Sequence, residues 1–272
     1  MQASEKMRKE RETIHVEENT LDLWLAFPED LAPAGAKEAC EAILSAEELE
    51  RARRFRFERH QREFIAMHAL GRMALSRHAC LPPEAWRFPT NEYGKPAAEP
   101  ECGLRFNLSD SDDLVVCLVA RKREVGVDIE VREQAEGIVG VARKAFSARE
   151  REQLEALDVE AKLERALALW TLKEAYTKAR GMGMALPLRE ISFVFGGAAG
   201  VELAVTGPEV DEAPQRWRFC MLNYAGHRIA IVVERNAAGI ADPDLRIWQA
   251  RPVTAPPQRL ELGKPEWFPR YL

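Results

Sequence analysis

The sequence lacks the features that mark secreted, disulfide-stapled and membrane-spanning proteins. It contains no Cys-x-x-Cys pair, and its five cysteines stand at wide, irregular spacings, which argues against a disulfide framework and a zinc site. No apolar run approaches the roughly 18 residues of a membrane-spanning helix. The first twelve residues, MQASEKMRKERE, carry charges of both signs and no apolar signal segment. We therefore expect a reduced, cytoplasmic protein that meets no membrane.

The chain also lacks an excess of positive charge. Its 39 Lys and Arg residues face 44 Asp and Glu residues, a net charge of −5, so the bulk charge repels nucleic acid. The 272 residues are 46% hydrophobic, which suits one large globular domain or two smaller ones. No His-x-His cluster, Gly-x-Ser-x-Gly elbow or Walker-type loop occurs, so zinc, triad and P-loop chemistries lack support.

The apolar pattern predicts two similar α+β halves, each with helix followed by strands. A capping box at Ser45 and Glu48 begins one helical stretch, and a second covers residues 147–180. The expected strands are 20–27, 104–108, 114–120, 124–131, 191–195, 217–224 and 228–234. The wholly apolar 114–120 is typical of a central strand that is buried on both faces.

These elements divide the chain into four expected parts. A loose extension is followed by two half-domains, and the last part, rich in Pro and Arg, is expected to wrap the surface or hang free. The parts are residues 1–19, 20–123, 124–240 and 241–272.

The strand VGVDIEV carries two carboxylates on one face. Alternation places its four large apolar residues on one side, and Gly126, Asp128 and Glu130 on the other. Side chains two apart on a strand lie roughly 6 to 7 Å from each other, a span that suits two oxygen ligands of one Mg²⁺ ion. The alternative is the solvent-facing side of an edge strand, where such a pair is merely tolerated.

The segment WTLKEAYTKARGMG offers a third carboxylate together with an ammonium group. Trp170, Glu174 and Lys178 stand four apart and line one helix face, and Gly181 suits the position just after the helix. Alternatively, Glu174 and Lys178 form an exposed ion pair along the helix, worth only about 0.3 to 0.5 kcal/mol.

The segment RARRFRFERHQR is strongly basic. Six arginines spread around a helix cannot all face one ligand, so some must be solvated surface. Arg51, Arg59 and Arg62 fall in one helix sector and are placed to bind phosphate groups bidentately.

Glu150 has two readings that the sequence leaves open. Ser147 followed by Glu150 is a capping box that would hold a helix N-terminus. The same carboxylate is also a candidate proton acceptor in catalysis.

Five motifs in order resemble those of the Sfp-type 4′-phosphopantetheinyl transferases: NEYGKP (91–96), FNLSDS (106–111), VGVDIE (125–130), FSARE (146–150) and WTLKEAYTKARGMG (170–183). The resemblance implies a pseudo-dimer of two α+β halves with the active site between them, in a monomeric protein. It implies transfer of the phosphopantetheine arm of coenzyme A to a serine of an acyl or peptidyl carrier protein. Adenosine 3′,5′-bisphosphate is released, and Mg²⁺, or Mn²⁺ in its place, is required.

The resemblance also implies a role for each matching residue. The metal ligands would be Asp128, Glu130 and Glu174. The groups that contact coenzyme A would be Arg51, Arg59, Arg62, Lys95, Ser109, Asp110 and Lys178, with the first half-domain binding its phosphates. Glu174 or Glu150 would accept the proton of the attacking serine, and the second half-domain would hold the metal and the carrier protein.

Asp110 departs from the family pattern, which usually has histidine after the motif serine. A carboxylate beside a phosphate repels it. Either Asp110 turns away, or the arginines hold the 3′-phosphate and selectivity for it is relaxed. Two other functions stay open: a non-catalytic module that binds coenzyme A or a carrier protein, and a metal-dependent nuclease, which would not explain NEYGKP and FNLSDS.

Overall fold

The computed structural model describes residues 17–31, 33, 35–196, 200–206, 210–235, 242–250, 256–263 and 265–268. Most of the expected extension over residues 1–19 lies outside the described residues. In the part of the chain that is described, no helix is both long and apolar enough to cross a bilayer.

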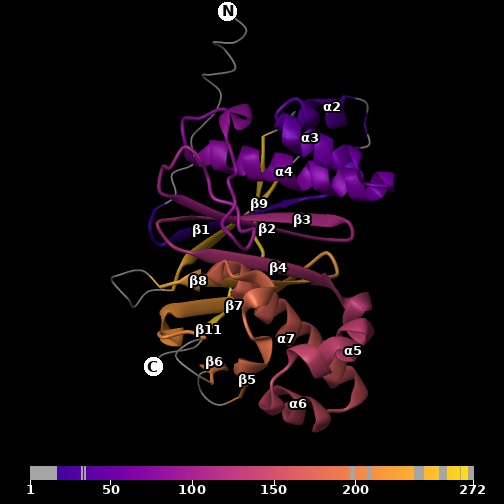
Figure 1. Ribbon diagram of the computed structural model, residues 1–272, viewed down its shortest axis with the longest axis vertical. Helices are drawn as coiled ribbons and strands as arrows, with labels where there is room; N and C mark the ends of the chain where they lie inside the picture. The colour runs from indigo at the N-terminus through magenta and orange to yellow at the C-terminus, as the bar shows by residue number, and fades with distance from the viewer. Residues whose placement is uncertain are drawn as a thin grey trace, which may run out of the picture.

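The first sheet is covered on its outer face by the helices of the N-terminal half (Figure 1). Its strand order is β10-β9-β1-β3-β2. The strands are β1 (Thr20–Ala26), β2 (Leu104–Ser111), β3 (Leu114–Arg121), β9 (Asp244–Gln249) and β10 (Gln258–Leu260). The helices are α2 (Ala36–Glu41), α3 (Ala46–Arg53) and α4 (Glu58–His78).

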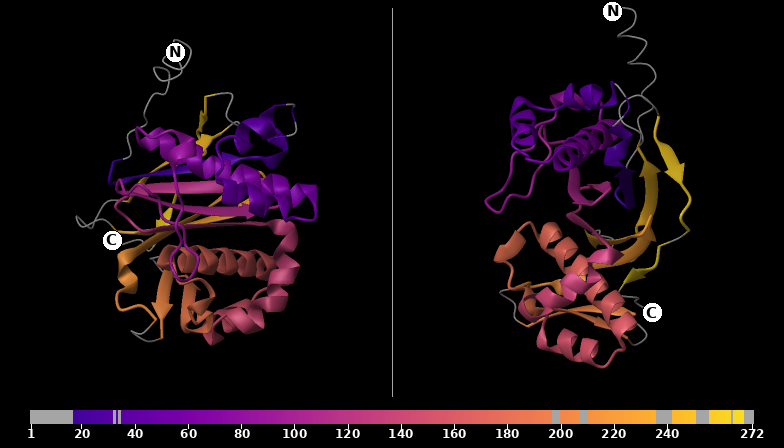
Figure 2. Two further views of the ribbon diagram at one scale, coloured as in Figure 1. Left: turned by 45° about the horizontal axis from the view of Figure 1, so that its top comes forward. Right: turned by 90° about the vertical axis from the view of Figure 1, so that its right-hand side faces the viewer.

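The second sheet lies against the first, and its own helices cover the far side (Figures 1 and 2). Its order is β11-β7-β8-β4, and a separate hairpin pairs β5 with β6. The strands are β4 (Val125–Val131), β5 (Ile191–Phe195), β6 (Val201–Val205), β7 (Trp217–Tyr224), β8 (His227–Glu234) and β11 (Trp267–Phe268). The helices are α5 (Ala135–Ala145), α6 (Ala148–Glu155) and α7 (Val159–Arg180).

Short 3₁₀ helices connect these elements, at Pro28–Leu31, Pro83–Ala85, Arg132–Gln134, Gly183–Ala185, Leu188–Glu190 and Pro214–Arg216. Apolar side chains fill the space between successive layers. Leu118, Val127 and Ile231 are fully buried between the two sheets. The strand predicted at 114–120 is confirmed as central and buried on both faces, because β3 lies between β1 and β2.

The described residues of the last part of the chain contribute strands to both sheets. β9 pairs in parallel with β1, and β11 pairs with β7. The cause is a carboxylate on β1: Asp22 is fully buried and accepts hydrogen bonds from Arg246 (2.8 and 2.6 Å) and from the Trp248 indole (2.6 Å). A buried carboxylate needs such partners, and β9 supplies them.

Glycine at position 126 allows α7 to cross β4 in backbone contact. A Cβ atom at Gly126 would lie 2.0 Å from the carbonyl oxygen of Ala175 and 2.5 Å from the amide nitrogen of Ala179. Both are backbone atoms, so no side-chain rotation relieves the overlap. Any larger residue must push the helix off the strand.

We therefore expect Gly126→Ala to destabilise the protein by about 3 kcal/mol or more, the upper range for overpacking. Urea unfolding followed by circular dichroism measures the effect. The matched control is Gly137→Ala in α5, where an added Cβ meets no atom within 4 Å and helix propensity improves. Equal stability of Gly126→Ala and the parent would contradict the close crossing.

The predicted capping box at Ser45 and Glu48 is confirmed and extends into a buried charge network. Glu48 accepts from the Ser45 amide (2.7 Å), from Arg72 Nε (3.0 Å) and contacts His68 Nδ1 (2.9 Å). Arg72 also donates to the carbonyls of Pro83 and Trp86. Burial opposes ionisation of Glu48, but the hydrogen bonds from His68 and Ser45 and the charges of His68 and Arg72 outweigh it and lower its pKa to about 2.

This lowered pKa predicts how stability changes in acid. The Glu48 carboxylate stabilises the folded state fully above its unfolded pKa of roughly 4.3, and the contribution disappears as the pH falls toward 2. Glu48→Gln is therefore expected to lower the free energy of unfolding at pH 6, with the difference from the parent shrinking between about pH 4.5 and pH 2. A constant difference across that range, measured by urea titration, would refute the assignment.

Candidate active site

The two sheets meet where their edge strands, β2 and β4, lie side by side. Asn107 on β2 is buried and its side-chain oxygen accepts a hydrogen bond from the Val127 amide of β4 (2.8 Å). This bond satisfies an edge amide that the second sheet leaves unpaired. It also aligns the strands so that Ser109, two residues further on, lies beside Asp128 (3.1 Å between Oγ and Oδ1).

Asp128 joins three elements through one carboxylate oxygen. Its Oδ1 accepts from Ser109 on β2 and from Lys178 Nζ on α7 (2.6 Å), and Lys178 also donates to Ser109 Oγ (2.8 Å). Asp128 is only 5% exposed, so its carboxylate does not face solvent as an edge-strand pair would. Lys178 therefore binds a carboxylate on β4. The alternative of an exposed ion pair along the helix surface does not explain this contact.

Glu130 and Glu174 complete a group of three neighbouring carboxylates. The Trp170 indole donates to Glu130 Oε1 (2.8 Å). Burial, followed by the charge of Asp128, raises the pKa of Glu130 to about 7. The same two causes raise the pKa of Glu174, against the opposing charge of Lys178. Burial also raises the pKa of Asp128 despite its contact with Lys178.

The donor chemistry of this group fits a divalent metal ion. Asp128 Oδ2 is buried and has no hydrogen-bond partner, an uncommon state for a carboxylate oxygen. Mutually repelling carboxylates with a spare oxygen are the hard ligands that Mg²⁺ prefers. The ligand cage is not assembled, however: no three Asp, Glu, His or Cys side chains of the described residues converge closely enough to hold a metal. Lys178 neutralises Asp128 instead.

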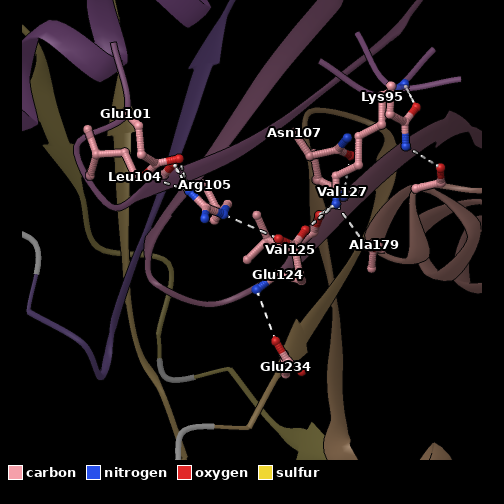
Figure 3. Close-up of polar contacts among 12 residues, drawn as sticks. Lys95, Glu101, Leu104, Arg105, Asn107, Glu124, Val125, Val127, Ala179 and Glu234 are labelled. Carbon is pink, nitrogen blue, oxygen red and sulfur yellow. Dashed lines mark hydrogen bonds and ion pairs between the residues drawn. The ribbon is translucent and has the colours of Figure 1, made fainter. Parts of the chain in front are cut away.

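Lys95 lies in the NEYGKP loop, which reaches from the first half to the end of α7 (Figures 2 and 3). Its ammonium group donates to Glu124 Oε2 (2.6 Å) and to the carbonyl oxygen of Ala179 (2.8 Å). Asn91 in the same loop donates to the carbonyl of Gly181 (2.8 Å). Gly181 has a left-handed conformation with φ of 66°, as its predicted place after the helix requires.

The arginines and Asp110 lie on the other face of β2, toward α4. Arg59 is exposed and pairs with Glu63 (3.6 Å), while Arg51 lies over the Phe64 ring (5.3 Å). Asp110 is also exposed and lies near enough to help raise the pKa of Glu63, after burial as the main cause. Arg62 is half-buried in the first turns of α4. Strand alternation turns Asp110 away from Ser109.

Glu150 lies in the core beneath α7, and the capping-box prediction is confirmed. It is fully buried, accepts from the amides of Ser147 and Phe193 (2.8 Å each) and forms an ion pair with the buried Lys173 (2.9 Å). Lys173 also donates to the carbonyls of Leu188 and Ile191. These contacts explain Glu150 as a structural residue and give it no contact with the three carboxylates.

Three residues of this region make contacts at the site that were not predicted from the sequence. Asn107 lies inside FNLSDS, but its hydrogen bond exists only because β2 lies beside β4, which the sequence does not show. Glu124 gains its role from Lys95, which is distant in sequence. Trp170 was placed on the correct helix face, and its spacing from Glu174 was the signal available for a contact with the carboxylates.

The buried pair predicts that Glu150→Gln destabilises the protein by about 3 to 5 kcal/mol, because Lys173 keeps its charge without an anion. Adding Lys173→Met is expected to recover part of the loss, and urea unfolding of the single and double variants tests both. If instead Glu150→Gln leaves stability unchanged and removes activity, Glu150 belongs to the catalytic groups.

Sequence comparison relates the chain to one superfamily. The sequence model of the 4′-phosphopantetheinyl transferase superfamily matches residues 124–232, the segment that holds Asp128, Glu130, Glu174 and Lys178. A partial structural likeness is to a holo-(acyl-carrier-protein) synthase from Bacillus anthracis, with a TM-score of 0.35 and 18% identity over 41% of this chain and 94% of that one.

Curated relatives extend the match beyond this segment. The 4′-phosphopantetheinyl transferase HetI of Nostoc is 38% identical over 53% of this chain and 62% of its own length. Sfp of Bacillus subtilis is 31% identical over 56% of this chain and 66% of its own length. A phosphopantetheinyl transferase of Thraustochytrium is 32% identical over 80% of both chains. The expected resemblance is confirmed, and the chain belongs to the Sfp-type 4′-phosphopantetheinyl transferase family.

Proposed function

We propose that this protein transfers the 4′-phosphopantetheine arm of coenzyme A to a serine of an acyl or peptidyl carrier protein. Adenosine 3′,5′-bisphosphate leaves as the other product. The observation that carries the proposal is the cluster of Ser109, Asp128 and Lys178, which gathers a hydroxyl, a carboxylate and an ammonium group from β2, β4 and α7.

We also propose that the fold is a pseudo-dimer with the site between its halves. Each half has a first strand, a long helix and a hairpin: β1, α4 and β2–β3, then β4, α7 and β7–β8. In each, the first strand pairs antiparallel with the last strand of the hairpin. This repetition supports half-domains over 20–123 and 124–240. Because one chain supplies both halves, we propose a monomer.

Asp128, Glu130 and Glu174 would hold the Mg²⁺ or Mn²⁺ ion. When bound, such an ion supplies positive charge to the pyrophosphate of coenzyme A, where negative charge increases during transfer. Lys178 adds a second positive charge at the same place, and Ser109 donates a hydrogen bond. Arg51, Arg59 and Arg62 would bind the 3′-phosphate at the outer face of β2, where the exposed Asp110 also lies.

Glu174 is the group that we propose as proton acceptor. The serine oxygen attacks the phosphorus bound to the pantetheine arm, and the bond from that phosphorus to the bridging oxygen of the pyrophosphate breaks. The serine proton passes to a carboxylate whose pKa is raised above its ordinary value, as suits a base near neutral pH. Glu174 is half-buried on α7, whereas Glu150 is enclosed in the core.

The decisive experiment is mass spectrometry of an apo carrier protein after incubation with the enzyme, coenzyme A and Mg²⁺. A mass gain equal to the phosphopantetheine arm is expected, together with adenosine 3′,5′-bisphosphate. Binding of coenzyme A or of carrier protein without any mass gain, across several carrier proteins, would indicate the non-catalytic module instead. The free cysteines suit a reducing compartment, and we propose a cytoplasmic location.

Asp128→Asn is expected to lower kcat/KM on the order of 10²-fold or more and to remove the rise in melting temperature that Mg²⁺ gives the parent protein. The amide keeps the size of the side chain but not its charge, so the melting temperature without metal should stay close to the parental value. The control is Glu152→Gln on α6, which removes one exposed carboxylate. A Mg²⁺-dependent rise that survives in Asp128→Asn would contradict the ligand assignment.

A further inference from the structure

The ammonium group of Lys95 is already saturated with acceptors. It donates to Glu124 Oε2 (2.6 Å), to the Ala179 carbonyl (2.8 Å) and, more weakly, to the Val125 carbonyl (3.4 Å). An ammonium has three N–H donors and no acceptor, and the Lys95 side chain is only 15% exposed. A phosphate could bind here only by displacing one of these partners.

The three acceptors belong to the two elements that cross at Gly126. Glu124 and Val125 stand at the start of β4, and Ala179 is in the last turn of α7. The carbonyl groups of a last helical turn have no partner within the helix, and a cation there also interacts favourably with the helix dipole. Lys95 therefore ties the end of α7 to the start of β4 at the close crossing (Figure 3).

The loop that carries Lys95 is held in a fixed conformation against the end of α7. Asn91 Oδ1 accepts from the amides of Tyr93 and Lys95 (3.0 and 2.9 Å), and its amide group donates to the Gly181 carbonyl. The stem of Lys95 packs on Gly181, where an added Cβ would lie 2.8 Å from the lysine Cδ. The loop thus contacts the helix end through both a side-chain amide and a lysine.

This clamp acts close to the site on both elements. Lys178, which binds Asp128 and Ser109, directly precedes Ala179. Asp128 follows Gly126 by two residues and shares its face of β4. Fixing Ala179 and Val125 relative to each other fixes the separation of Lys178 and Asp128.

We propose that Lys95 is a positioning residue, which sets the geometry between Lys178 and Asp128 by clamping α7 to β4, and that it does not bind a phosphate of coenzyme A. The kinetic part of this inference rests on the proposed function. The clamp itself rests on the contacts alone.

The kinetic test compares Lys95→Met, Glu124→Gln and the double variant, with Lys37→Met as the control. Among the described residues, Lys37 forms polar contacts with Gln61 and Glu41 near the surface. We expect Lys95→Met to lower kcat about tenfold and to change the KM for coenzyme A less than about threefold, because an interaction that orients catalytic groups affects kcat. Glu124→Gln should act in the same direction, and the double variant should fall no more than about twofold below Lys95→Met. Glu124→Gln keeps the carbonyl contacts of Lys95 and carries the test if Lys95→Met fails to fold.

A KM for coenzyme A that rises tenfold or more in Lys95→Met, with kcat retained and with Glu124→Gln unaffected, would make Lys95 a phosphate ligand and overturn the proposal. An unchanged kcat in Lys95→Met would overturn it as well.

Equilibrium unfolding of the same variants tests the clamp without any activity. The effects of the two single substitutions on the unfolding equilibrium constant should not simply multiply. The unfolding constant of the double variant should be at least about threefold smaller than the product of the two single effects predicts. Multiplicative effects would refute the clamp. If coupling is present but the parent transfers no phosphopantetheine, the proposed function fails and the clamp stands.

Discussion

At Gly126 the backbone of β4 meets the backbone of α7 with no side chain between them, and the arrangement of the site depends on that contact. Because the helix lies directly on the strand, a lysine from its last turns can bind a carboxylate that faces it. The same proximity brings the exposed carbonyls of the helix end within reach of a loop from the other half. The absence of a Cβ atom at Gly126 thus sets the distance between the charged groups of α7 and those of β4.

The buried charges of this protein fall into two kinds. Around Glu48 and Glu150, each carboxylate has hydrogen-bond donors for both oxygens and a cation beside it. Such networks fix the conformation of the helices that they cap. Around Asp128 the balance is incomplete, with three carboxylates, one ammonium and an oxygen that lacks a donor. Imperfect satisfaction is typical of functional sites, and the Asp128 carboxylate shows it at the place where the two sheets meet.

The sequence alone allows much of this to be predicted, where the signal is local. Alternation in VGVDIEV assigned Asp128 and Glu130 to one face, the strands at 191–195 and 217–224 matched β5 and β7, and both capping boxes formed. Long-range features escaped prediction. Lys178 has Glu174 one turn away, and only the crossing of α7 with β4 directs it to Asp128. Helix α5 was missed because its two glycines depress helix propensity. Strand β9 was missed because the alternation in DLRIWQ covers only four residues of a segment rich in Pro and Arg.

The pairing of β9 with β1 has a consequence for the order in which the protein is completed. Asp22 and its partners Arg246 and Trp248 are separated by more than 220 residues of sequence. Until the ribosome has made β9, the first sheet has an open edge at β1, and a carboxylate in its interior lacks its cation. The first sheet is therefore closed at β1 only after most of the second sheet has been made, and until then the nascent chain carries a pairing edge open to other chains.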